Sequence, residues 1–121
     1  MIETALIGFG TAILIGAFMA VYGLQHHHIP KALAVLHGLA VLTGIIFLVL
    51  FIAKQGLATW WWIAGVFLLT AAGGLYLLLK DLRKQQFPLW LLVLHALAGL
   101  AGFIILLIAY LRDRYDEGFP S

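Results

Sequence analysis

Two histidines, His37 and His95, are the residues of this sequence whose type and spacing point to chemistry. They lie in the matching segments VLHGLA and VLHALA, 58 positions apart, and each is inside a long apolar run. An ionisable side chain in such a run is costly, and a functional role is the default hypothesis when a partner can be named. Polar partners in these runs are few, and a buried imidazole without a hydrogen bond costs about 1–3 kcal/mol. A cofactor whose metal ion takes both rings as ligands removes this cost, because neutral imidazole is a common metal ligand.

The composition places the two histidines inside a membrane. Of the 121 residues, 64% are hydrophobic and 10% are charged, which lies outside the range of soluble domains. Four stretches between the charged residues are each long enough to supply the roughly 20 apolar residues that cross a bilayer. We therefore predict a single transmembrane domain over residues 1–121, folded as an all-α integral membrane four-helix bundle in the lipid bilayer. The predicted helices are 4–24, 31–53, 58–80 and 88–111, followed by a short polar tail at 113–121 that we expect to be solvated and disordered.

The residue types that are missing exclude several classes of protein. The chain has no cysteine, which excludes disulfides, thiolate metal sites and covalent c-type haem attachment. Its net charge of +2 does not come from a basic patch with stacking aromatics, so we expect no nucleic-acid partner. The predicted spans cannot assemble a nucleophile, an orienting acid and an oxyanion site, which excludes a hydrolase or transferase.

The sequence matches itself at an offset of 58. Ten of the seventeen positions in 30–46 are identical in 88–104, including the proline, the histidine and a glycine, and a shared Leu/Ala-rich composition explains these three poorly. The match continues more weakly at Phe9 and Phe67 and at Gly16 and Gly74. We therefore predict two helical hairpins in the same orientation, related by a pseudo-twofold axis along the bilayer normal. Both histidines then lie about 10 Å inside the same membrane face, on parallel helices.

Small residues lie beside both histidines. Gly38 directly follows His37, and Ala96 directly follows His95. The positions three and seven residues after each histidine share its helix face. These positions are Ala40, Gly44, Ala98 and Gly102. Because small side chains leave room for a flat macrocycle, we predict one b-type haem (haem b) between the two helices, with His37 and His95 as the axial ligands of its iron. In helices 4–24 and 58–80 we interpret the small residues as packing seams.

The membrane face nearer the histidines is also the more basic one. Its cations are Lys31, Lys80, Arg83 and Lys84. We expect the propionates of a haem to point to this face, where Lys31, Arg83 and Lys84 can neutralise them by charge-assisted hydrogen bonds. The other face carries three cations, so the positive-inside rule gives only a weak preference for cytoplasmic hairpin loops. We expect a bacterial or archaeal cytoplasmic membrane.

In general plan, His37 and His95 with their neighbouring Gly and Ala positions resemble the membrane cytochromes b. In that group, four-helix cores bind haem through histidine pairs on separate helices, with small residues near the ring. The resemblance implies an electron-transfer subunit rather than a stand-alone enzyme, with other membrane redox subunits or quinone as partners in a homo- or hetero-oligomer. This chain has a single intramembrane pair, whereas many such proteins stack two haems, so a complete electron path across the bilayer is not implied.

Three other interpretations stay open. The histidines can be a duplicated packing motif, each donating to a helix carbonyl or a threonine, in a cofactor-free structural or assembly subunit. They can also bind two chlorin pigments, since chlorophyll-type pigments take one axial histidine each. The triplet His26-His27-His28 can bind zinc, copper or nickel, although adjacent histidines in a loop are more often a solvated connector.

Overall fold

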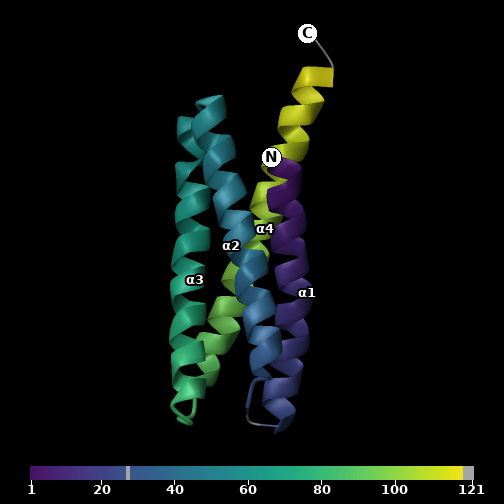
Figure 1. The fold of residues 1–121 in the computed structure, drawn as a ribbon. Coiled ribbons are helices and arrows are strands. Elements are labelled where there is room, and N and C mark those ends of the chain that lie inside the picture. Colours follow the sequence, from purple (N-terminus) through teal and green to yellow (C-terminus); the bar gives the residue numbers. More distant parts are fainter. Residues whose placement is uncertain (27, 119–121) are drawn as a thin grey trace.

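The computed structural model describes residues 1–26 and 28–118, and it folds as a bundle of four long helices (Figure 1). The helices are α1 (Ile2–His26), α2 (Lys31–Gln55), α3 (Trp61–Leu82) and α4 (Leu89–Gly118), with a short 3-10 turn, η1 (Ala58–Trp60), before α3. Successive helices run in opposite directions, so α2 and α4 are parallel and both termini lie at one end (Figure 1). The described residues form no strand, and the predicted all-α four-helix bundle is confirmed.

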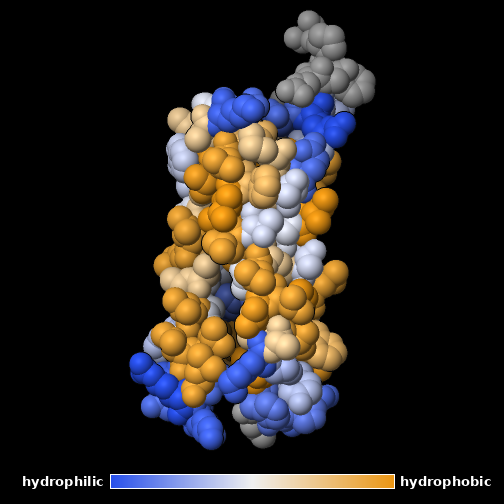
Figure 2. Space-filling view, in the orientation of Figure 1, coloured by the Kyte–Doolittle hydropathy of each residue, from blue (hydrophilic) through white to orange (hydrophobic). Residues whose placement is uncertain are grey.

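All four helical segments are long and apolar enough to cross a membrane, as an integral membrane protein requires. The bilayer core offers no water to backbone amides, so a spanning chain has to satisfy them within its own helices. An apolar band covers the visible side of the bundle, and hydrophilic residues gather at its two ends (Figure 2). Large apolar side chains such as Leu14 and Leu69 are exposed by 75% and 77%, which suits a surface that contacts lipid.

Local signals at the helix ends explain the bounds. Pro30 precedes α2 in an extended conformation, and its carbonyl accepts a hydrogen bond from the Ala34 amide. The carbonyl of Pro88 accepts in the same way from the Leu92 amide at the start of α4. Gly56 ends α2 with φ +66°, a left-handed conformation that suits glycine because it has no Cβ.

The end of α4 differs from the sequence-based expectation of a helix that ends at residue 111 and a disordered tail over residues 113–121. The helix continues to Gly118 and projects beyond the other helices, while residues 119–121 lie outside the described part (Figure 1). The Arg114 guanidinium donates to the Tyr110 hydroxyl at 2.9 Å, one turn earlier. Contacts between residues four apart support a solvated helix, and the arginines of this segment are good helix formers.

Each helix packs against two neighbours, and two diagonal pairs face each other across the bundle. α1 and α3 both pack against α2 and α4, whereas the described residues give no close backbone approach between α2 and α4 or between α1 and α3. The buried apolar core lies in the half nearer the termini, where Leu48, Ile52 and Leu106 are fully buried. The two histidines lie in the other half, nearer the loops that join α1 to α2 and α3 to α4.

Candidate functional site

The structure brings His37 and His95 together across the diagonal between α2 and α4. Their ring centroids are 6.3 Å apart and the ring planes are inclined by 67°. Both rings are half-buried. Two imidazoles from parallel helices therefore share one depth in the bundle.

Each imidazole is held by a backbone carbonyl of the preceding helix. His37 Nδ1 lies 2.8 Å from the Ala12 carbonyl oxygen of α1, and His95 Nδ1 lies 2.9 Å from the Thr70 carbonyl oxygen of α3. A carbonyl oxygen only accepts, so each Nδ1 carries the proton and donates. The proton of each neutral ring is thereby assigned, and Nε2 keeps its lone pair. No hydrogen bond to either Nε2 occurs in the described part of the chain.

Two glycines let the rings reach these carbonyls. A Cβ added at Gly16 would lie 3.0 Å from Cε1 of His37, and a Cβ added at Gly74 would lie 2.7 Å from Cε1 of His95. Gly16 and Gly74 therefore form flat platforms on α1 and α3 for the two rings. Their sequence-based interpretation as packing seams is incomplete, because each packs against an imidazole. The sequence does contain a signal for this role: Gly16 and Gly74 are 58 positions apart, as the two histidines are.

Both rings line an apolar cavity of about 590 Å³ in the centre of the bundle. Apart from the histidines, the polar side chain on its wall is that of Thr70, whose hydroxyl already donates to the Val66 carbonyl oxygen at 2.7 Å. Gly38 and Ala96, predicted to lie beside a cofactor, are on the wall, and a Cβ added at Gly38 would meet nothing within 4 Å. A hollow with a hydrophilic group in its depth opens in the apolar band below the middle of the bundle (Figure 2). Cavities of about 300–1,000 Å³ are the size that binds small molecules and cofactors.

The other four small residues that we predicted around a macrocycle lie elsewhere. Gly44 packs against the ring of Phe9, and Gly102 packs against the ring of Phe67. The Ala40 carbonyl lies against Gly8 of α1, and the half-buried Ala98 is not on the cavity wall. Sequence spacing correctly groups residues on a helix face, but it does not fix which sector of that face turns to the centre. In the folded bundle, Gly44 of α2 faces α1, and Gly102 of α4 faces α3.

The predicted propionate partners lie outside the cavity wall. Lys31, Arg83 and Lys84 are exposed at the end of the bundle nearer the histidines. The cavity closes towards that end with Gly23, Ile29 and Phe87. The three cations therefore lie outside the cavity, exposed at the end of the bundle, and none of them lines its interior.

The histidine triplet is at the same end. The rings of His26 and His28 are exposed, with centroids 6.3 Å apart, and each Nδ1 is bonded to a nearby backbone carbonyl. His26 also stacks on Tyr22, with centroids 4.1 Å apart. His27 lies outside the described residues. Within the described part of the chain, no group of three metal-binding side chains comes together.

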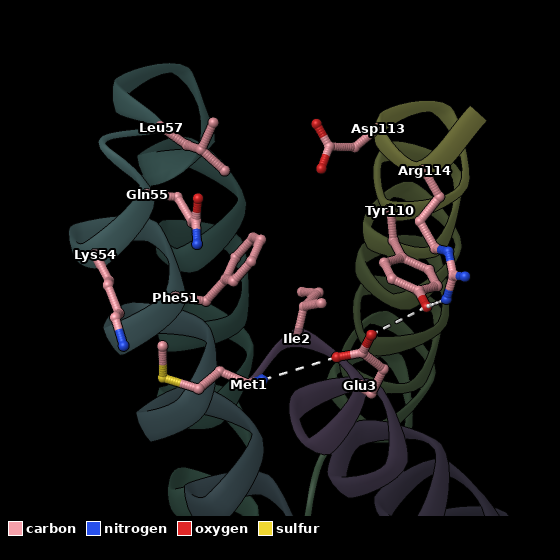
Figure 3. Close-up of a pocket in the computed structure, with 10 residues that line it drawn as sticks. All are labelled: Met1, Ile2, Glu3, Phe51, Lys54, Gln55, Leu57, Tyr110, Asp113 and Arg114. Carbon is pink, nitrogen blue, oxygen red and sulfur yellow. Dashed lines mark hydrogen bonds and ion pairs between the residues drawn. The ribbon is translucent and has the colours of Figure 1, made fainter. Parts of the chain in front are cut away.

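A second cavity, of about 520 Å³, lies at the end with the termini, and its wall carries charged side chains (Figure 3). The Tyr110 hydroxyl donates to Glu3 at 3.3 Å, and the amino group of Met1 lies 3.7 Å from the same carboxylate. Lys54 and Asp113 also border it. The amino group of Met1, Glu3, Tyr110 and Arg114 thus form one chain of polar contacts at this end.

The fold and the site define a four-helix bundle whose helices are long and apolar enough to cross a membrane, with a pair of histidines in a central apolar cavity. A scan against family models, a search of curated proteins and a search of solved structures each give no match to this chain.

Proposed function

We propose that the protein binds one haem b between α2 and α4, with His37 and His95 as axial ligands, and transfers electrons within a membrane redox complex. The observation that carries this proposal is the geometry of the two rings. Imidazoles on opposite sides of one metal ion have centroids about 6 Å apart, because metal–nitrogen bonds are about 2 Å long and each ring adds about 1 Å. The observed separation of 6.3 Å fits this requirement.

The chemistry of the donors also fits haem. Both Nδ1 atoms donate to carbonyl oxygens, which leaves both Nε2 lone pairs available to a metal, and hydrogen bonds of this kind fix the orientation of a ligating imidazole and raise its basicity. The cavity wall includes several small residues, among them Ala17, Gly38, Ala71 and Ala96. A flat, mostly apolar group would find an apolar lining there.

Haem bound at this site would supply one-electron exchange at its iron. The residues of the chain do the rest: the two imidazoles hold the metal, the carbonyls of Ala12 and Thr70 orient the imidazoles, and the apolar wall excludes water. Lys31, Arg83 and Lys84 would hold the propionates at the end of the bundle nearer the histidines. Because His37 and His95 would both be taken up in holding the iron, the site would favour electron transfer over oxygen chemistry.

We further infer that the chain contains two copies of one helical hairpin. Three kinds of contact recur at positions 58 apart: the histidine to a carbonyl, the histidine on a glycine, and a phenylalanine on a glycine. The last is Phe9 on Gly44 in the first hairpin and Phe67 on Gly102 in the second. Recurring contacts support a repeat more strongly than recurring letters, since shared composition does not produce them.

Partners and location follow from the same proposal. A single haem in one half of the bundle needs a donor and an acceptor outside this chain, which we place on other membrane redox subunits or in the quinone pool. We place the protein in a bacterial or archaeal cytoplasmic membrane, with the α1–α2 and α3–α4 loops in the cytoplasm.

The absorption spectrum of the purified protein tests the proposal. We expect a reduced-minus-oxidised spectrum with a sharp α-band, and we expect His37→Ala and His95→Ala each to remove it, because each deletes one axial ligand. His28→Ala is the matched control: it removes an exposed imidazole at the loop end and should leave the band unchanged. A folded wild-type protein that stays colourless after incubation with haem contradicts the proposal, and a green pigment indicates chlorin binding.

One observation favours a second candidate function. Each histidine already has a hydrogen bond to the neighbouring helix, and such bonds can fasten the two helices of a hairpin without any cofactor. In that case the protein is a structural or assembly subunit of a larger membrane complex. A colourless protein whose thermal stability falls in both histidine variants supports this candidate.

A further inference from the structure

Phe9 of α1 and Phe67 of α3 form a stacked pair in the centre of the bundle. Their ring centroids are 3.9 Å apart and the planes are inclined by 7°, and the side chains are 3% and 5% exposed. The pair bridges the diagonal between α1 and α3, as the histidine pair bridges the diagonal between α2 and α4. We call these two rings the phenylalanine floor.

The phenylalanine floor is the boundary between the packed and the hollow half of the bundle. Both rings belong to the buried core, which continues towards the termini with Leu48 and Leu106. Both rings also line the cavity that contains the two imidazoles. On α1 and α3 they are the cavity residues that lie nearest to the termini.

The floor has little freedom to move. A Cβ at Gly44 would lie 2.7 Å from the ring of Phe9, and a Cβ at Gly102 would lie 3.3 Å from the ring of Phe67. Each ring is thus pressed between the backbone of a neighbouring helix and the other ring. Close-packed interiors of this kind transmit strain and resist extra atoms.

We propose that Phe9 and Phe67 determine which porphyrins the cavity accepts, by limiting the size of the substituents on the edge of the ring that faces the packed half. This inference rests on the proposed binding of haem. The propionates of a haem would be held at the end with Lys31 and Arg83, so the opposite edge, which bears the two vinyl groups, meets the floor. A vinyl group fits against a flat aromatic wall, and a bulkier substituent there meets rings that cannot retreat.

Haems that differ at the two vinyl positions test the proposal. The affinities of the purified apoprotein for deuterohaem, haem b and diacetyldeuterohaem are measured by titration, for the wild type and for Phe9→Ala/Phe67→Ala. We expect the double variant to gain at least about tenfold in affinity for diacetyldeuterohaem relative to haem b, because the wall that opposes the acetyl groups is gone. The acetyl groups have the same electronic effect on ligation in both proteins. Comparing the affinity ratio, diacetyldeuterohaem to haem b, of the double variant with that of the wild type therefore cancels this effect.

Phe103→Ala is the matched control. Phe103 packs against the same core but does not line the cavity, so its variant should keep the wild-type ratio. A second variant, Phe9→Leu/Phe67→Leu, keeps the core apolar and shortens the wall. It should shift the affinity ratio in the same direction, and it provides the test if Phe9→Ala/Phe67→Ala does not fold. A ratio that is equal in all four proteins overturns the role of the floor, while the haem b spectrum of the wild type still supports the haem site. A wild type that binds none of the three haems overturns both.

Discussion

The imidazole of His95 can lie against the backbone of α3 because position 74 has no side chain. The ring then reaches the Thr70 carbonyl, one turn earlier on the same helix. Gly16 and the Ala12 carbonyl do the same for His37. The absence of a side chain at Gly16 and Gly74 therefore decides where both rings lie.

Gly74→Ala tests this platform. We expect the new methyl group to displace the His95 ring and to weaken its hydrogen bond to Thr70, a loss of about 0.5–1.5 kcal/mol in the free energy of unfolding. Haem affinity, followed by titration, should fall with it. Gly65→Ala is the control on the same helix, because a Cβ there would meet nothing within 4 Å. Equal behaviour of the two variants would show that the platform has no role.

At the scale of the elements, the two hairpins make corresponding contacts, but the backbones of their helices do not approach each other equally closely. Gly8 of α1 lies against the backbone of α2, where an added Cβ would be 3.0 Å from the Ala40 carbonyl oxygen and 3.1 Å from the Gly44 amide nitrogen. The position 58 residues later is Val66, whose side chain lies against Gly102 of α4. A glycine lets two helix backbones approach, and a valine at the same place holds them apart.

Gly8→Leu should therefore damage the α1–α2 contact. The side chain would meet backbone atoms, which cannot rotate away, and overpacking of this kind costs about 1–3 kcal/mol. Thermal unfolding in detergent, followed by circular dichroism, measures the effect. Gly65→Leu adds the same side chain on the exposed side of α3 and should unfold near the wild-type temperature. A Gly8→Leu protein as stable as this control would mean that α1 and α2 do not need a close approach.

At the scale of the whole molecule, the bundle is packed in one half and hollow in the other. The buried core fills the half nearer the termini, and the cavity of about 590 Å³ occupies the half with the histidines. Cavities remove stabilising contacts, since atoms at their walls have no partners on one side. A ligand that fills the hollow half is therefore expected to stabilise the entire bundle.

Haem should accordingly raise the unfolding temperature. A ligand at one hundred times its dissociation constant stabilises the folded state by about 2.7 kcal/mol when it does not bind the unfolded chain. We expect a rise for the wild type and none for the double variant His37→Ala/His95→Ala, measured by differential scanning calorimetry with and without haem. A rise of the same size in both proteins would indicate haem dissolved in the micelle or bound elsewhere.

The distribution of cations over the two ends predicts the orientation in the membrane. The end with the histidines carries Lys31, Lys80, Arg83 and Lys84, and the other end carries Lys54, Arg112 and Arg114. We expect alkaline phosphatase fused to the C-terminus to be active, because the cytoplasmic side is the one richer in Lys and Arg. Lys80→Gln/Arg83→Gln reverses the imbalance and should lower this activity, whereas Asp113→Asn should not, since acids contribute little. An inactive fusion of the unaltered chain contradicts the orientation.

The sequence by itself determined the four helices and their order along the chain. Apolar stretches of this length have one stable form in a bilayer, because the lipid cannot bond to the backbone. The predicted bounds agree with α1, α2 and α3 to within two or three residues, and Pro30 and Pro88 mark where α2 and α4 begin. The extension of α4 was missed, because charged residues beyond a membrane span are compatible with both a helix and a disordered tail.

The tertiary structure decided which residues surround the histidines. The sequence identified His37 and His95 by type and offset, and it grouped Ala40 and Gly44 on one helix face correctly. It could not give the rotation of α2 about its own axis, and in the folded bundle Gly44 turns to Phe9 while Gly16, on another helix, supports the imidazole. Periodicity relates residues within a helix, whereas the rotation of each helix is set by packing among all four, which depends on side chains far apart in the sequence.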